Sequence, residues 1–327
     1  MPLFDLPLEA LREYRAKHEA PADFDDFWAT TLRESRALGF PTRVEPVDNG
    51  LALVETADVT FAGFGGDPVR AWWHRPADTE PVAVVVEFMG YSGGRGLAHQ
   101  QGEWPLAGCA HLLVDSRGQG WAQTRPGATT DPHGTGSAVP GQMTRGIEDP
   151  ETYYYRRLYT DAALALDVAR GLADGVPLFV AGGSQGGGLT IAAAALDRIG
   201  GGAAAGIAGA MPDVPFLCDF PRATTITGAH PYSELVTYLA TFRDRVEQVF
   251  RTLSYFDGVH LAARAESPAL FSVALMDQVC PPSTVFAAFN AWASDEKSIE
   301  VYPFNGHEGG GVYQRAKQLD WLRNRIA

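Results

Sequence analysis

The pentapeptide Gly182-Gly183-Ser184-Gln185-Gly186 is the segment with the clearest chemical potential. It follows an apolar run typical of a strand and precedes an alanine-rich run typical of a helix, which is the setting of a hydrolytic serine nucleophile. A sharp turn there lifts the serine out of the sheet, and free N–H groups at the helix start can stabilise an oxyanion. A phosphate-binding loop is disfavoured, because no Lys-Ser or Lys-Thr follows the glycines and the G-x-G-x-x-G spacing is absent.

A serine hydroxyl needs a general base, because it is almost fully protonated at neutral pH. Three histidines follow Ser184 in the chain: His230, His260 and His307. The first two fall in a stretch that interrupts the alternation of strands and helices, whereas His307 directly follows the last strand. We therefore expect His307 to be the base, and the alternative is a histidine that caps a helix or fills the core.

The acidic partner of the base should follow a strand between these two positions. Asp277 ends the apolar run SVALMD and precedes the turn QVCPP. Asp213 follows a weaker strand, and Asp257 lies in the interrupting stretch. Strand-end position favours Asp277, which would orient the imidazole and stabilise its charged form. The alternative for Asp277 is an ordinary turn-forming aspartate.

Two backbone N–H groups are expected to form an oxyanion hole. One belongs to Gln185, the residue after the serine, and the other to a loop after an early strand. In VVVEFMGYSGGRG that loop contains Tyr91, whose N–H we nominate as the second donor. The Tyr91 ring is also predicted to bind substrate as a wall of the acyl pocket, and an ordinary loop aromatic is the alternative.

The elements around these residues predict an α/β fold. Apolar runs of strand length cover 82–88, 111–115, 177–183, 205–211, 269–276 and 298–304, and helical patterns cover 153–172, 185–199, 282–293 and 309–326. Strands that alternate with helices form a mostly parallel, doubly wound sheet.

One domain over 1–327 is expected, with two additions to the sheet. A helical and β extension covers 1–80, with two amphipathic helices in 7–38 and a hairpin turning at 65–67. A helical lid is inserted at about 213–266. The Gly- and Pro-rich loop 115–150 is long enough to be functional. Arg117 should hold this loop by pairing with a carboxylate, and Tyr153, Tyr154 and Tyr155 should be packing residues.

Composition excludes several classes of function. Lysine and arginine number 26 against 39 aspartates and glutamates, so the net charge of −13 disfavours nucleic acids and anionic membranes. Cys109, Cys218 and Cys280 are too few and too far apart for a disulfide framework or a zinc ribbon, and each is predicted to be a buried hydrophobic residue. No metal or cofactor is expected. The N-terminus lacks a basic and then apolar leader, and no run reaches membrane-spanning length, so a cytoplasmic protein is expected.

Several irregular segments resemble one known family. They include GYSGGRG, DSRGQG, MTRGIEDPETYYYRR, GGSQGGG, DVPFLCDF, HPYSE, FRTLSYFDGV, MDQVCPPSTVFAAFN and NGHEGGG, in order from about residue 90 to 311. Together with FDLPLEAL and FDDFW near the N-terminus, they resemble the acetyl xylan esterase and cephalosporin C deacetylase family, which is carbohydrate esterase family seven of the α/β-hydrolase superfamily.

The resemblance implies a serine esterase that removes acetyl groups from xylo-oligosaccharides and cephalosporin C. Carried over by position, Ser184 is the nucleophile, Asp277 the acid and His307 the base, with Tyr91 and Gln185 as oxyanion donors. It also implies a homo-hexamer, a trimer of dimers, that admits small substrates. The sequence departs from the expected pattern at Glu87, before the oxyanion loop, and in the small-residue stretch 200–209.

Two other functions remain open at this point. A related serine hydrolase, such as a peptidase or thioesterase, would share the three residues but have a different pocket. A non-enzymatic scaffold with the same fold is disfavoured, because such proteins usually lack part of the triad.

Overall fold

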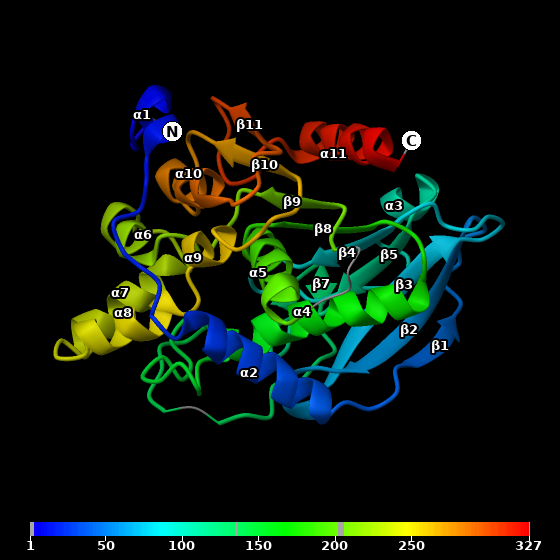
Figure 1. Ribbon diagram of the computed structural model, residues 1–327, viewed down its shortest axis with the longest axis horizontal. Coiled ribbons are helices and arrows are strands. Elements are labelled where there is room, and N and C mark those ends of the chain that lie inside the picture. The colour runs from blue at the N-terminus through cyan, green and yellow to red at the C-terminus, as the bar shows by residue number, and fades with distance from the viewer. Residues whose placement is uncertain (1–2, 135, 202–205, 327) are drawn as a thin grey trace.

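A computed structural model describes residues 3–134, 136–201 and 206–326 (Figure 1). Its main sheet has nine strands in the order β1-β2-β3-β5-β4-β8-β9-β10-β11. All neighbours from β5 to β11 in this order are parallel, and β1, β2 and β3 join the sheet in antiparallel fashion. The predicted α/β fold with a mostly parallel sheet is confirmed.

The bounds of the elements are as follows. The strands are β1 Arg43–Val47, β2 Val54–Ala62, β3 Pro68–Pro76, β4 Val84–Phe88, β5 Ala110–Val114, β6 Trp121–Ala122, β7 Arg125–Pro126, β8 Leu178–Gly183, β9 Gly209–Asp213, β10 Ala269–Ala274 and β11 Lys297–Tyr302. The helices are α1 Leu8–Glu13, α2 Phe24–Ala37, α3 Glu103–Leu106, α4 Tyr154–Leu172, α5 Gln185–Ile199, α6 Phe220–Ile226, α7 Tyr232–Thr241, α8 Val246–Ser254, α9 Gly258–Ala262, α10 Pro282–Ala291 and α11 Gly311–Ile326, with a short 3-10 turn, η1, at Phe64–Gly66.

Helices cover both faces of the sheet, as a doubly wound fold requires. Alternate residues of β4 point to opposite faces. Val84 and Val86 belong to the larger apolar core, which includes α2, α4 and α5, whereas Val85 belongs to a second core with Trp104 of α3 and Leu322 of α11. Figure 1 shows α4 and α5 on one side of the sheet and α11 on the other.

Most predicted elements lie within a few residues of their observed positions. The hairpin predicted around residues 65–67 is formed by β2 and β3, and it carries the additional edge strand β1. The weak strand predicted at 205–211 is β9, which begins later, at Gly209. Residues 202–205, within the small-residue stretch, lie outside the described residues. The short helix α3 was not predicted, because four residues give too little periodicity.

The N-terminal strands extend the main sheet, and four helices fill the interruption between β9 and β10. These are α6, α7, α8 and α9, which lie together on one side of Figure 1.

The side chains predicted to be packing residues are buried. Tyr153, Tyr154 and Tyr155 are fully buried, as are the three cysteines, which confirms their predicted packing roles. In the described ranges, no helix combines the length and the apolar character that a bilayer crossing needs.

The long loop 115–150 is anchored by Arg117, as predicted. The Arg117 side chain is fully buried, and its Nη2 donates to Asp161 Oδ1 at 2.7 Å while its Nη1 donates to Asp67 Oδ2 at 2.9 Å. The Tyr154 hydroxyl donates to the Arg117 carbonyl at 2.6 Å. The loop is therefore tied to both α4 and the β2–β3 hairpin at its first residues.

Replacing Arg117 should destabilise the fold strongly. Arg117→Met leaves the buried Asp161 carboxylate without its cation, which we expect to lower the free energy of unfolding by about 3–5 kcal/mol. Chemical denaturation measures this change. The control Arg75→Met breaks an ion pair with Glu55 in which the side chains are 45% and 51% exposed, so it should cost less than about 1 kcal/mol. Equal losses in the two variants would contradict the anchoring role.

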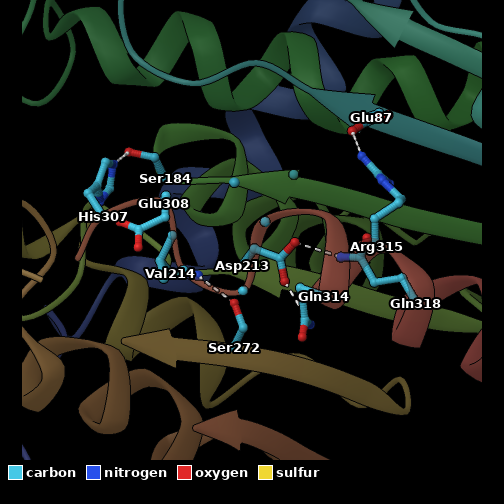
Figure 2. Close-up of a pocket in the computed structure, with 15 residues that line it drawn as sticks. Glu87, Ser184, Asp213, Val214, Ser272, His307, Glu308, Gln314, Arg315 and Gln318 are labelled. Atoms are coloured by element: carbon cyan, nitrogen blue, oxygen red, sulfur yellow. Dashed lines mark hydrogen bonds and ion pairs between the residues drawn. The ribbon is translucent and has the colours of Figure 1, made fainter. Parts of the chain in front are cut away.

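Asp213 ties the end of β9 to α11. Its carboxylate accepts hydrogen bonds from Gln314 Nε2 at 3.0 Å and Gln318 Nε2 at 2.7 Å, which lie one helical turn apart (Figure 2). Burial raises the pKa of Asp213 to about 6, and Arg315 and these hydrogen bonds only partly offset the rise. Because α11 begins four residues after His307, this contact holds the helix that carries the histidine loop.

The raised pKa of Asp213 predicts a pH-dependent stability. The folded state binds a proton at Asp213 more tightly than the unfolded state does, so the contribution of Asp213 to stability is largest below about pH 4 and is lost as the pH rises through about 6. Asp213→Asn cannot titrate. The difference in unfolding free energy between the native protein and this variant should therefore fall by up to about 3 kcal/mol from pH 4 to pH 7.5. Denaturant titrations across this range would show it, and a constant difference would contradict it.

Candidate active site

Ser184 occupies a strained turn between β8 and α5. Its backbone has φ +57° and ψ −119°, a conformation that L-residues with a Cβ seldom adopt. The Ser184 N–H donates to the Asp213 carbonyl at 3.0 Å, and its carbonyl accepts from the Phe216 N–H at 2.9 Å. The segment after β9 therefore holds the serine backbone on both sides, which offsets the cost of the turn.

The glycines of the pentapeptide are required by close backbone approach. A Cβ on Gly182 would lie 2.5 Å from the backbone of Gly186, and a Cβ on Gly186 would lie 2.2 Å from the Phe88 carbonyl oxygen. Neither contact is possible for a larger residue. Small residues on either side of Ser184 thus let the turn sit directly against the end of β4.

The structure brings Ser184, His307 and Asp277 into one hydrogen-bonded chain. His307 Nε2 lies 2.9 Å from Ser184 Oγ, and His307 Nδ1 lies 2.9 Å from Asp277 Oδ2. The three residues follow the ends of the parallel strands β8, β10 and β11, whose carboxyl ends share one edge of the sheet. Fold topology therefore assembles residues that are up to 123 positions apart in sequence.

The environment of Asp277 determines the tautomer of His307. Asp277 is fully buried, and its Oδ1 accepts from the N–H groups of Val279 at 2.8 Å and Cys280 at 3.0 Å. The other oxygen faces His307. Because an ionised carboxylate can only accept, His307 Nδ1 carries the proton and Nε2 accepts from the serine hydroxyl. This is the arrangement in which a histidine can take the serine proton.

The alternative acids and bases have other partners. His260 contacts His18, with 3.0 Å between ring nitrogens, and His230 Nε2 lies 2.7 Å from Glu234. Asp257 accepts backbone N–H groups of α6 and α9, including that of Val259 at 3.0 Å. Asp213, described above, faces α11 through its side chain and Ser184 only through its carbonyl.

The N–H groups of Tyr91 and Gln185 belong to two segments that meet at the ends of β4 and β8. β4 and β8 are in register, with Phe88 opposite Gly182, so the loop after β4 lies next to the turn after β8. Within the part of the chain that the structure describes, the N–H groups of Tyr91 and Gln185 have no hydrogen-bond acceptor. Gln185 is the first residue of α5, where backbone N–H groups are free to bind an anion.

A buried glutamate of α7, not identified from the sequence, fixes the Tyr91 ring. Glu234 Oε1 accepts from the Tyr91 hydroxyl at 2.7 Å, and Glu234 Oε2 accepts from the Met143 N–H at 3.0 Å. Burial raises the pKa of Glu234, and these hydrogen bonds partly offset the rise. No local pattern in the sequence marks Glu234 as buried, and His230, whose Nε2 lies 2.7 Å from Glu234 Oε1, precedes α7.

A polar cavity of about 220 Å³ lies beside Ser184 and His307 (Figure 2). It extends towards Glu87, which accepts from Arg315 Nη2 at 2.7 Å and from Trp104 Nε1 at 2.9 Å. Burial raises the pKa of Glu87, but Arg315 and His111 outweigh this and hold it below the usual range. Glu87, noted in the sequence as an unexpected acid, is thus a paired residue on the α11 face.

One group of potential metal ligands occurs among the described residues. Ligand atoms of Asp277, Cys280 and His307 lie within 4.8 Å of one another. Asp277 and His307 already share a hydrogen bond, and burial raises the pKa of the Cys280 thiol well above its ordinary value. A protonated thiol is a poor metal ligand, so these residues fit a proton-transfer chain better than a metal site.

Comparison with known proteins supports one family. Over residues 1–325 the sequence matches the acetyl xylan esterase (AXE1) family. An acetyl xylan esterase from Paenibacillus sp. R4 is 35% identical, with a TM-score of 0.89 over 98% of this chain and 99% of that chain. Acetyl xylan esterase 1 from Thermoanaerobacterium sp. JW/SL YS485 is 33% identical, with a TM-score of 0.85 over 97% and 98% of the two chains.

A curated relative is similar over a shorter length. The acetyl esterase Axe7A of Xylanibacter ruminicola is 28% identical over 200 residues, which are 57% of this chain and 40% of that protein. The aligned part thus spans less than half of that relative. The match to the AXE1 family, in contrast, covers nearly the whole sequence. This chain belongs to the acetyl xylan esterase family.

Proposed function

We propose that this protein removes acetyl groups from small acetyl esters, including acetylated xylo-oligosaccharides and cephalosporin C, through an acetyl-enzyme on Ser184. The hydrogen-bonded chain from Ser184 through His307 to Asp277 carries the proposal. Family membership supports ester hydrolysis. The preference for acetyl groups and sugars is supported by the names of the similar proteins.

The first chemical step forms the acetyl-enzyme. Ser184 Oγ attacks the acetyl carbonyl carbon while His307 Nε2 takes the hydroxyl proton, and Asp277 stabilises the resulting imidazolium. The N–H groups of Tyr91 and Gln185 donate to the oxyanion that forms on the carbonyl oxygen. The tetrahedral intermediate collapses when its carbon–oxygen bond to the alcohol breaks and His307 returns the proton to the leaving alcohol.

The second step hydrolyses the acetyl-enzyme. Water replaces the departed alcohol, His307 Nε2 takes its proton, and the hydroxide attacks the acetyl carbon. The same pair of N–H groups holds the second oxyanion. Acetate leaves when the bond to Ser184 Oγ breaks and His307 reprotonates the serine. No other reactant is needed, so the stoichiometry is one ester and one water to one alcohol and one acetic acid, which ionises to acetate and a proton.

Acetate release tests the proposed function directly. The native protein should release acetate from acetylated xylose and from cephalosporin C, and Ser184→Ala should lose several orders of magnitude in kcat because its nucleophile is absent. The matched control is Ser298→Ala, which removes an exposed hydroxyl on β11 and should retain the native rate.

A different outcome would identify a different hydrolase. Faster cleavage of long-chain acyl esters or peptides would replace the acetyl esterase assignment by a thioesterase or peptidase with the same three residues. If a fluorophosphonate probe fails to label Ser184 in the folded protein, the result would favour the alternative of a non-enzymatic scaffold.

We also propose that six chains assemble as a trimer of dimers. Large apolar side chains are unusually exposed on the segment that carries His307: Phe304 is 85%, Val312 is 79% and Tyr313 is 77% exposed. Such a patch is typical of an interaction site. Since family resemblance suggests a hexamer, we assign this patch to a contact between copies of the chain.

Sedimentation measurements test the assembly. Six chains of 35.2 kDa predict a particle of roughly 210 kDa. Phe304→Glu should shift the mass towards smaller species, because it places a charge in the apolar contact. The control Leu53→Glu changes another exposed apolar residue, which directly precedes β2 near the opposite edge of the sheet from β11, and should leave the mass unchanged. A native mass near that of one chain would contradict the proposal.

A further inference from the structure

We propose that Gln119 is a positioning residue that fixes the two halves of the oxyanion hole relative to each other. This inference rests on the proposed function. The two N–H donors come from separate segments, the loop after β4 and the start of α5, which contact each other but are far apart in the chain. An oxyanion is stabilised only when both donors are held at the correct distance. Gln119 contacts both segments.

The side chain of Gln119 lies between the oxyanion loop and the residue after the nucleophile. Its Oε1 accepts from the Ser92 N–H at 2.7 Å, and its Nε2 donates to Gln185 Oε1 at 2.8 Å. Gln119 itself is buried, with 7% exposed. Ser92 directly follows Tyr91 and has a positive φ of 67°, so the oxyanion loop is strained where Gln119 holds it.

These amides form a directed chain that begins and ends in the oxyanion loop. Ser92 donates to Gln119, Gln119 donates to Gln185, and Gln185 Nε2 donates to the Met89 carbonyl at 3.3 Å and back to Gln119 Oε1 at 3.4 Å. Each amide can serve its neighbours in only one orientation, because reversing either one would place two acceptors or two donors together. Hydrogen bonds in such chains polarise one another.

The position of Gln119 is fixed from outside this chain. Gln119 Nε2 also contacts the Tyr154 hydroxyl at 3.0 Å, and the Tyr155 hydroxyl donates to Gln185 Oε1 at 3.1 Å. Arg117, two residues earlier, carries the buried ion pairs described above. The loop 115–150 therefore holds the Gln119 amide in a fixed position between the oxyanion loop and Gln185. The Gln119 side chain forms no hydrogen bond with the hydroxyl of Ser184 or with His307.

Kinetics on p-nitrophenyl acetate separate positioning from support of the fold. Gln119→Met removes the hydrogen bonds of the Gln119 amide, including those with Ser92 and Gln185, and should lower kcat about 100-fold with KM nearly unchanged, because the oxyanion exists only after attack. The matched control is Gln142→Met, since Gln142 is also buried and supports the same loop by donating from Nε2 to the Gly118 carbonyl at 2.7 Å. This control should lose stability but keep kcat within about threefold.

The isostere Gln119→Glu gives a readout that a purely structural role would not move. Its carboxylate still accepts from Ser92 but opposes Gln185 Oε1, so activity should be low at neutral pH. Protonation restores a donor, and the ratio of the variant's kcat to the native kcat should therefore rise as the pH falls, at temperatures where both proteins are folded. Gln185→Met interrupts the same chain of hydrogen bonds at its other amide and should show the same loss of kcat. It therefore tests the chain even if Gln119→Met does not fold.

Labelling of Ser184 by a fluorophosphonate keeps this inference separate from the substrate assignment. The phosphoryl oxygen uses the same N–H donors, so labelling of Gln119→Met should slow by a factor similar to kcat, whatever ester the native protein prefers. If the native protein is labelled but does not hydrolyse acetyl esters, the proposed function is overturned and the positioning role of Gln119 is not. Folded Gln119→Met with native kcat and labelling rate, or equal kcat losses in the Gln119 and Gln142 variants, would overturn the positioning role.

Discussion

The positive φ of Ser184 is the constraint on which the rest of the site depends. This turn exposes the hydroxyl at the sheet edge, and it persists because β9 and the segment after it bind the serine backbone on both sides. It also requires Gly182 and Gly186, whose missing side chains let the turn press against the end of β4. That same approach brings the loop containing Tyr91 beside the start of α5, so one strained residue determines the position of Ser184 and of the two N–H groups that we propose as oxyanion donors.

Buried polar groups, rather than the apolar core alone, fix the segments around this turn. Arg117 anchors the long loop through Asp161 and Asp67, and Glu234 ties α7 to the Tyr91 hydroxyl. A buried charge without its partner is costly, so these contacts favour a single arrangement of each loop. The loops carry function because they are held at several points by the rigid α/β scaffold.

The fold and the three central residues could be predicted from the sequence because their signals are local. Alternating apolar runs indicate strands and helices, and Ser184, Asp277 and His307 each lie in the turn that follows such a strand. Less was predictable where the signal is short or non-local. β9 begins later than expected because its apolar run is weak, α3 is only four residues long, and Glu234 looks like any helical glutamate until its burial is known.

The sequence by itself determined which residue types stand at the ends of parallel strands, and hence which chemistry was available. Only the tertiary structure decided the contacts around them: that Glu87 pairs with Arg315, that Glu234 binds the Tyr91 hydroxyl, and that Gln119 lies between Ser92 and Gln185. The physical reason is that strand pattern follows from the polarity of neighbouring residues, whereas the partner of a polar side chain depends on segments that chain topology brings together from distant positions.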